Sequence, residues 1–507
     1  MKKFSISVCY FHLNQTLAEP PDRVSPTAEF IWENLIKLSE KLPFTELKDL
    51  KSQLVCYEFD GEYQDFKHQT KTLNLINQWL TKEQEKIVLT AIHKNQLAIS
   101  GNLQPFLWHD TYAFDLTLSP ADDERDIAAA EIDLFEPSSL FLDFSENTLG
   151  ETIWLYGQTE IPDTECQGVA DELVRNLLKN TNFTFRLVHK GNLLKVPLFE
   201  YEISQANQPN KLYRILVWID NQGISPDVTS VYDDLFNSLL TRHKIEYIYQ
   251  QAKKSYIAAR KAYSELEAKI TQFKQDKPLE ELQKLLESMP ELSMQYQRQL
   301  RNLQGHYTTI KTNQLNYQTY LQKFWQPGDI PSWREFGKIT CKRYLDQIEI
   351  YLSYIQPGKD LIGEFINTLR GLVEIEQAKS DRKLQELLQI KEDREKERDR
   401  NLQITIAVIG VGIGVAGVVS SSYTLAVDKP WASPSFQHPL PLHPFFSAVI
   451  ISCLCGGVLG WLALLTARKV LKSSSDRQSV SGSQSQPVNP VLQEAEEVRS
   501  TRDTEVR

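Results

Sequence analysis

Cysteine is scarce in this sequence, and none of its six cysteines stands in a C-x-x-C pair. The scattered thiols are typical of a reduced, cytosolic protein and indicate neither a disulfide framework nor a zinc site. A P-loop, a G-x-S-x-G motif and an H-E-x-x-H motif are also missing, so the familiar catalytic signatures are absent. We therefore expect a protein that is not an enzyme and that carries no cofactor.

The sequence also lacks an excess of basic residues. The chain of 507 residues has a net charge of -10, and its isoelectric point is about 5.6. Nucleic acid is therefore not expected as a partner, because phosphate binding requires a basic surface. The mean hydropathy is -0.37, so any membrane segment must be local, and the length predicts two or three folded parts.

Residues 1–230 mix strand and helix patterns and predict an α+β cytosolic domain with much antiparallel sheet. The first strand alternates, which predicts one buried face and argues against an export signal. The two alternating sets are Phe4, Ile6, Val8 and Tyr10, and Ser5, Ser7 and Cys9. Glycine-containing turns near Gly101-Asn102 and at Lys190-Gly191-Asn192 predict two hairpins, and Trp108-His109-Asp110 is expected on a strand.

One acidic cluster in this domain could bind a hard divalent cation through carboxylate oxygens. Its candidate ligands are Asp122, Asp123 and Asp126. The alternative is a solvated loop or helix start that follows Ser119-Pro120.

Residues 231–400 predict a helical stalk. Apolar and aromatic residues follow heptad spacing from Ile245 to Phe273 and again from Tyr296 to Phe324, with Gln314 as the one polar seam position. A short turn joins the two seams and predicts an antiparallel coiled coil, through which a protein partner could bind. The helical pattern is expected to break at Trp325–Gly328 and again at Pro357-Gly358.

Two uncharged stretches, 401–423 and 445–467, are long enough to predict transmembrane helices and a lipid bilayer as partner. Basic residues lie before the first and after the second, whereas the external loop 424–444 has only Lys429, so both termini are expected in the cytoplasm. The multi-pass membrane protein is expected in a bacterial inner membrane, and the tail 468–507 is predicted to be disordered. Two G-x-x-x-G pairs predict helix packing, at Gly410, Gly414, Gly456 and Gly460.

This layout of an α/β body, a long stalk and two C-terminal spans resembles the CorA-type magnesium transporter superfamily. The family's Gly-Met-Asn after the first span is replaced by Ser420-Ser421-Ser422-Tyr423, so no functional residue carries over by motif. The resemblance implies a homo-oligomeric, CorA-like membrane protein whose body and stalk control ion transport or regulated permeation. The alternative is a membrane-anchored coiled-coil scaffold or sensor that binds a partner protein or a small ligand.

Overall fold

A computed structural model describes residues 1–16, 24–57, 62–63, 78–82, 85–95, 97–205, 213–224, 227–273, 277–426, 450–463, 465–466 and 469. The chain divides into two compact units, residues 1–373 and 374–507, so that the boundary falls inside one long helix. The domain boundaries that the sequence predicts at residues 230, 400, 423, 444 and 467 stay a prediction. The external loop and the tail fall almost wholly outside the described residues.

The first unit is built on one large mixed sheet, in the strand order β2-β4-β5-β1-β6-β9-β8-β7 with β3 paired to β4. Neighbouring strands are antiparallel except β6 and β9, which run parallel. The strands are β1 (Lys2–Leu13), β2 (Gln78–Trp79), β3 (Ile87–Lys94), β4 (Leu97–Trp108), β5 (Thr111–Pro120), β6 (Thr148–Gln158), β7 (Phe183–Leu193), β8 (Val196–Gln205) and β9 (Tyr213–Asp220).

Strand β1 is central, and both of its faces are covered. Phe4, Ile6 and Val8 lie in one core, while Cys9 and Phe11 lie in a second core on the opposite face. The prediction of a single buried face is therefore wrong. It failed because small polar side chains on the second face resemble a solvent face, although helices cover them.

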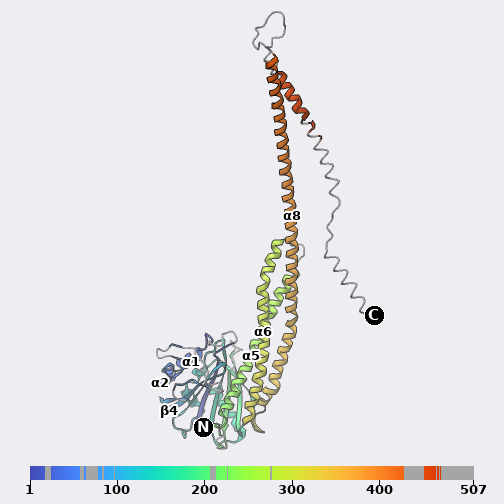
Figure 1. Cartoon of the computed structure of the whole chain (residues 1–507). Coiled ribbons are helices and arrows are strands. Elements are labelled where there is room, and N and C mark those ends of the chain that lie inside the picture. Colours follow the sequence, from blue (N-terminus) through green and yellow to red (C-terminus); the bar gives the residue numbers. More distant parts are fainter. Residues whose placement is uncertain are drawn as a thin grey trace, which may run out of the picture. The chain divides into compact units, whose positions relative to one another are not determined.

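Short helices cover the first face of the sheet (Figure 1). They are α1 (Phe30–Leu38), α2 (Thr45–Lys48), α3 (Leu50–Gln53), α4 (Asp163–Leu177) and the 3₁₀ turns η2 (Ala129–Phe135) and η3 (Pro137–Ser139). Buried side chains of α1 and α4 follow helical spacing and form one core with the sheet; examples are Trp32, Leu35, Ala170 and Val174.

Both predicted hairpin turns lie at other residues. Gly101 sits inside β4, where an added Cβ would collide with the Thr117 carbonyl oxygen, and the chain turns instead at His109, whose φ is 54°. The second turn falls at Leu194-Lys195, both with positive φ, while Gly191 lies against the backbone of Ile330. These glycines permit close packing between segments, which local sequence does not reveal.

The second face of the sheet is covered by a helical bundle. It contains α5 (Tyr232–Gln272), α6 (Leu279–Phe324), α7 (Pro331–Glu335), the π-helical turn η4 (Phe336–Thr340) and the first part of α8 (Cys341–Ala426). Figure 1 shows α5 and α6 beside the lower part of α8. Tyr249 and Tyr256 of α5 stack on Tyr344 and Tyr351 of α8, with ring centroids 3.8 and 4.1 Å apart.

The heptad seams are buried as predicted at Ile245, Ala252, Ala259 and Leu266 of α5. Gln314, the polar seam position of α6, donates to the Gly337 carbonyl oxygen at 2.7 Å and thereby ties α6 to η4. The predicted stop of the helix at Trp325 is confirmed, since α6 ends at Phe324.

The predicted break at Pro357-Gly358 is wrong, because α8 runs through both residues. Gly358 leaves space for two tyrosines: an added Cβ would lie 2.8 Å from a ring carbon of Tyr263 and would collide with the Tyr296 hydroxyl. That hydroxyl donates to the Ile355 carbonyl oxygen, so packing supports a continuous helix through a residue pair that locally favours its end.

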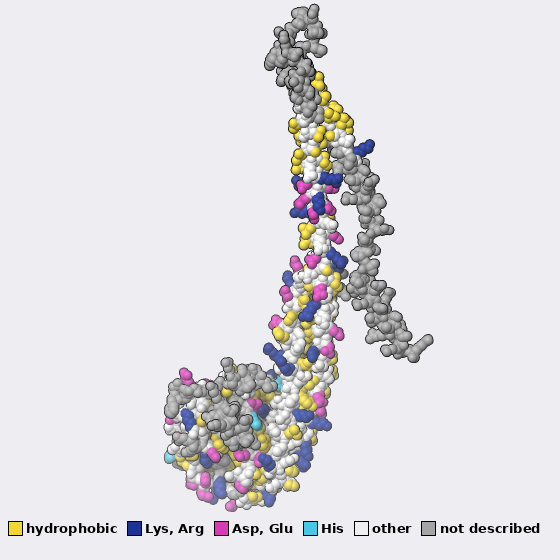
Figure 2. Space-filling model, in the orientation of Figure 1, with side chains coloured by type: hydrophobic (Ala, Val, Ile, Leu, Met, Phe, Trp, Pro, Cys, Tyr) yellow, Lys and Arg dark blue, Asp and Glu magenta, His cyan; other side chains and the backbone are white. Residues whose placement is uncertain are grey.

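In the second unit, the described chain consists of the rest of α8 and the helical residues 450–463, 465–466 and 469. Apolar side chains gather on the surface of the last described part of α8 (Figure 2), among them the exposed Leu402, Ile406 and Ile409.

No helix in the part of the chain that the structure describes is both long enough and apolar enough to cross a membrane. The predicted fold class with two C-terminal transmembrane helices is therefore wrong, and so are the multi-pass inner-membrane location and the membrane and ion-transport assignments. The stretch at 401–423 is part of the 86-residue α8, and the described residues of the stretch at 445–467 are helical.

Candidate functional site

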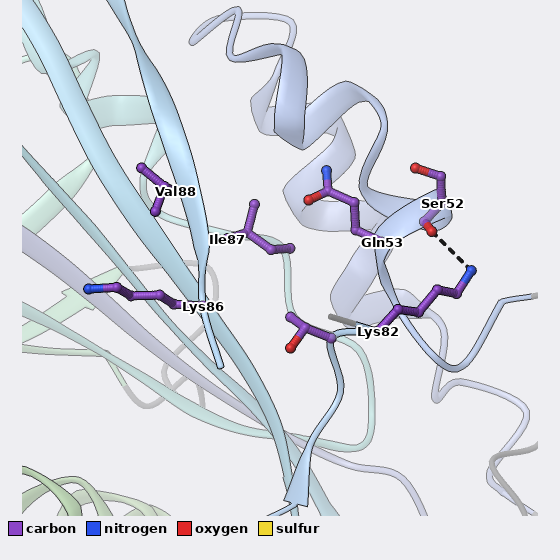
Figure 3. A pocket seen from close by; sticks show the side chains of 7 residues that line it. Ser52, Gln53, Lys82, Lys86, Ile87 and Val88 are labelled. Carbon is purple, nitrogen blue, oxygen red and sulfur yellow. Dashed lines mark hydrogen bonds between the residues drawn. The ribbon is translucent and has the colours of Figure 1, made fainter. Parts of the chain in front are cut away.

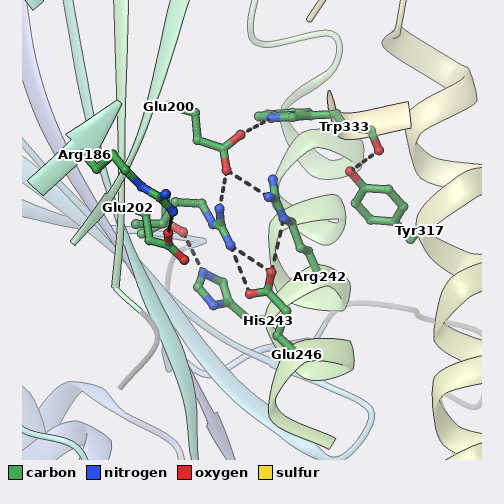
Figure 4. A network of polar contacts seen from close by, with 10 residues as sticks. Arg186, Glu200, Glu202, Arg242, His243, Glu246, Tyr317 and Trp333 are labelled. Atoms are coloured by element: carbon green, nitrogen blue, oxygen red, sulfur yellow. Dashed lines mark hydrogen bonds and ion pairs between the residues drawn. The ribbon is translucent and has the colours of Figure 1, made fainter. Parts of the chain in front are cut away.

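The sheet and the bundle meet through a buried network of four charged side chains (Figure 4). Glu200 of β8 accepts hydrogen bonds from Arg214 of β9 and from Arg242 of α5, the latter at 2.9 Å. Arg214 also donates to both carboxylate oxygens of Glu246 on α5, at 2.9 and 3.0 Å. Two arginines and two glutamates give the network a net charge of zero. Among the described residues, the Nε of Arg214 and the Nε and Nη1 of Arg242 are buried without a hydrogen-bond partner.

Glu200 also contacts a second element of the bundle. The indole nitrogen of Trp333 in α7 donates to its free oxygen at 3.2 Å, and the guanidinium of Arg242 lies 4.8 Å from the centre of the Phe336 ring in η4. One carboxylate therefore connects the sheet to α5 and to the segment that leads into α8.

Burial raises the pKa of Glu200, but the charges of Arg242 and Arg214 outweigh burial and lower that pKa to about 2. The carboxylate is thus ionised at neutral pH although its side chain is fully buried. A charge held in this way is costly to bury and is retained only while its partners stay in place.

Three more contacts fasten the first half of α5 to the sheet. His243 is hydrogen-bonded to Thr152 of β6 at 2.7 Å, and Lys244 pairs with Asp110 in the β4–β5 turn. At the start of the helix, the hydroxyl of Tyr232 donates to Asp115 of β5 at 2.6 Å.

The buried histidines make stability depend on pH. Burial, and then the charges of Arg214 and Arg242, lower the pKa of His243 well below 6.5, and burial lowers the pKa of His12 and of His306 to about 4. The folded chain keeps these rings neutral, whereas the unfolded chain protonates them below about pH 6.5. The contribution of these histidines to stability is therefore fully present above that pH and is lost as the pH falls.

We expect the urea midpoint of the full chain to fall between about pH 6.5 and about pH 5, with a smaller fall in His243→Gln. Asp115 opposes the effect in part, because burial raises its pKa to about 6 and so favours the folded state as the pH falls. Circular dichroism during urea titration measures both chains. Equal falls in the two would show that His243 does not contribute.

An aromatic cavity of about 330 Å³ lies between the sheet and the first turns of α5. Its floor is the second face of the sheet, with Asp115, Trp154 and Trp218, and its cover is α5, with Tyr232 and Phe236. Its size lies at the lower end of the range for small-molecule sites.

Two other cavities have polar walls. One of about 430 Å³ borders the charged network and is lined by side chains of both signs, so it does not select a ligand by charge. The other, of about 390 Å³, lies between Ser52 and Ile87 (Figure 3), where Lys82 already donates to the Ser52 carbonyl oxygen at 2.9 Å.

Two of the three predicted cation ligands have other partners. Asp126 pairs with the N-terminal amino group of Met1, and Asp122 accepts a hydrogen bond from the backbone of Glu124 at 3.1 Å. Within the described ranges, no three His, Cys, Asp or Glu side chains gather in a way that could hold a metal ion. Divalent cation binding at Asp122, Asp123 and Asp126 stays a prediction.

The glycine pairs were predicted to pack helices together. A methyl group at Gly410 or Gly414 would meet no atom within 4 Å, whereas one at Gly412 would lie 3.6 Å from the Gly456 carbonyl oxygen and one at Gly460 would lie 4.0 Å from Val408. The structure thus places the close approach of the two segments at Gly412, Gly456 and Gly460.

Sequence reasoning missed the charged network and the cavity. A signal was present, because Glu200 and Arg214 stand among the apolar residues of their strands, and charges there are buried only when they are paired. The partners on α5 could not be identified, since Arg242 and Glu246 look like ordinary charges at the start of a coiled coil.

Comparison of the sequence with protein-family models and with curated proteins finds no match. The resemblance to the CorA-type superfamily therefore stays a prediction, without support or contradiction from relatives.

Proposed function

We propose that this chain is a non-enzymatic sensor and scaffold. In this proposal the sheet domain binds a small ligand, and α5 transmits the structural change caused by binding to the helical bundle. The observation that carries the proposal is the position of Glu200, which holds Arg242 of α5 and Trp333 of α7 at once. A shift of β8 or β9 relative to α5 would separate buried opposite charges, so the sheet and the bundle are expected to move together.

Helix α5 supports the same proposal by its continuity. Its first turns cover the aromatic cavity, its next turns hold the charged network, and its remaining turns form the seam with α6 and α8. A single helix of 41 residues transmits a displacement over its whole length without a hinge, and it contains neither glycine nor proline.

The output of the bundle is, in this proposal, the binding of another protein. In the second unit, α8 exposes a set of large apolar side chains between charged ones, and exposed apolar patches are typical of binding surfaces. These side chains, each about half exposed, are Leu384, Leu387, Leu388 and Ile390. Association of the chain with copies of itself stays a prediction.

The proposal is tested by hydrogen exchange of the full chain with Glu246→Gln. This change removes one anion from the network and leaves the cavity intact. We expect faster exchange in α5 beyond Ala252 and in the parts of α6 and α8 that pack on it, while α1 and α4 on the opposite face of the sheet keep their wild-type rates.

The matched control is Glu265→Gln, the same substitution at an exposed position of the same helix. It should change no rate outside its own turn. Faster exchange only in the first turns of α5 would contradict transmission, and equally faster exchange in α1 and α4 would show general destabilisation instead.

A further inference from the structure

We propose that the aromatic cavity beneath α5 binds a small organic ammonium ion. The inference names the ligand class of the proposed sensor and rests on that proposed function for its biological meaning, although binding can be measured independently. Three features carry it: a hollow formed by small side chains, a buried carboxylate that forms no ion pair with the described part of the chain, and a surrounding set of aromatic rings.

The hollow results from the residue sizes on β1. Ser5, Ser7 and Cys9 point to the second face of the sheet, and their partners across the sheet include Tyr156, Trp154 and Asp115. Small side chains at the centre and large ones beside them leave space under α5. A well-packed core would have placed larger side chains on the central strand.

Asp115 supplies the charge. Its side chain is only 6% exposed, and its two oxygens accept hydrogen bonds from Thr117 at 3.1 Å and from Tyr232 at 2.6 Å. Among the described residues it has no ion-pair partner. Each carboxylate oxygen can accept a second hydrogen bond, so Asp115 can still receive a donor from the cavity.

The energetics favour a cationic occupant. A buried carboxylate without a cation is penalised by desolvation, and for Asp115 this burial raises the pKa to about 6. A ligand cation in the cavity offsets that penalty, whereas an anion increases it. Lys3 also lines the cavity, but its side chain is exposed to water, so its repulsion is screened more strongly than the attraction of buried Asp115.

The aromatic rings complete the recognition. The ring centroids of Trp154 and Tyr156 each lie 5.5 Å from that of Trp218. The indole N–H of Trp218 donates to the carbonyl oxygens of Leu193 and Val196, so this residue offers the cavity carbon surface only. Aromatic surfaces around a carboxylate attract ammonium groups through cation–π interactions.

The test is isothermal titration calorimetry of the full chain with choline, tetramethylammonium and phenethylammonium, each as its chloride. The neutral comparison is 3,3-dimethyl-1-butanol, which has the shape of choline without its charge. We expect at least one of the cations to bind, and the neutral alcohol to bind about tenfold or more weakly than choline.

Two variants separate charge from shape. Asp115→Asn keeps the size of the side chain but removes its charge, and it should weaken binding of the cations about tenfold. Trp154→Leu keeps the charge but removes an aromatic ring, and it should weaken binding about fivefold. Asp360→Asn, the same change at an exposed position of α8, should leave affinity unchanged. Circular dichroism establishes that each variant is folded.

No binding by any of the three cations, or equal binding of choline and the neutral alcohol, overturns the proposal. Unchanged affinity in both folded variants, Asp115→Asn and Trp154→Leu, overturns the location. These outcomes are independent of the exchange experiment with Glu246→Gln, so failure of the ligand site and failure of transmission through α5 are distinguishable.

Discussion

Glu200→Gln is expected to lower the free energy of unfolding by about 3 kcal/mol, because it leaves two buried arginines with one carboxylate between them. Glu200 is fully buried and accepts hydrogen bonds from Arg214, Arg242 and Trp333. The amide of glutamine can replace one acceptor but not the charge. Urea unfolding of the full chain, followed by circular dichroism, measures the change.

The matched control lies two residues further along the same strand. Glu202 pairs with Arg186 at 2.8 Å, but both side chains are more than half exposed, so Glu202→Gln should cost less than about 1 kcal/mol. Because the pKa of Glu200 is lowered to about 2, its contribution is full above the unfolded pKa near 4.5 and is lost as the pH falls towards 2. Equal costs for the two variants at neutral pH would contradict the role given to the buried network.

Gly358→Ala and Gly363→Ala are expected to change stability in opposite directions, although both glycines lie in α8. At Gly358 a methyl group would meet the rings of Tyr263 and Tyr296, and the overpacking should cost about 1–3 kcal/mol. At Gly363 it would meet no atom within 4 Å, and alanine should stabilise the helix by about 0.5–1 kcal/mol.

This pair tests whether α8 is continuous through Pro357. If the helix ended at Pro357-Gly358, Gly358 would lie in a turn away from Tyr296, and its substitution would cost little. Thermal unfolding of both variants measures the difference, and a shift of the same sign at the two positions would contradict the packing described for α8.

The sequence was most informative where one periodicity extends over many residues. The seam of α5 was predicted at Ile245, Ala252, Ala259 and Leu266, and these side chains are buried. Heptad spacing is a local property that survives in the fold because the partner helix only has to match it. The end of α6 at Phe324 was also predictable from local sequence, because a proline and a glycine follow closely and disfavour a helix.

The wrong predictions concern places where contacts with distant segments determine the local structure. Gly101 and Gly191 indicate turns locally, but their neighbours across the fold, Thr117 and Ile330, need the space that a missing side chain leaves. The helix break expected at Pro357-Gly358 does not occur, because the contact of Tyr296 with Ile355 supports a continuous helix. Tertiary packing outweighs turn propensity in each case.

The candidate site was the least predictable part. The cavity depends on Ser5, Ser7 and Cys9, whose small size was interpreted as a solvent face, and on α5 crossing that face. Asp115 and Tyr232 are 117 residues apart in the chain, and no local pattern joins them. Hydrophobic length alone also failed for the two stretches taken as membrane spans.

The most direct test of the account is the hydrogen exchange of the full chain with Glu246→Gln. We expect exchange to accelerate along α5 at Ala259 and Leu266, far beyond the substituted turn, while α1 and α4 keep their wild-type rates. Acceleration confined to the turns around residue 246 would contradict the claim that α5 connects the sheet domain to the bundle.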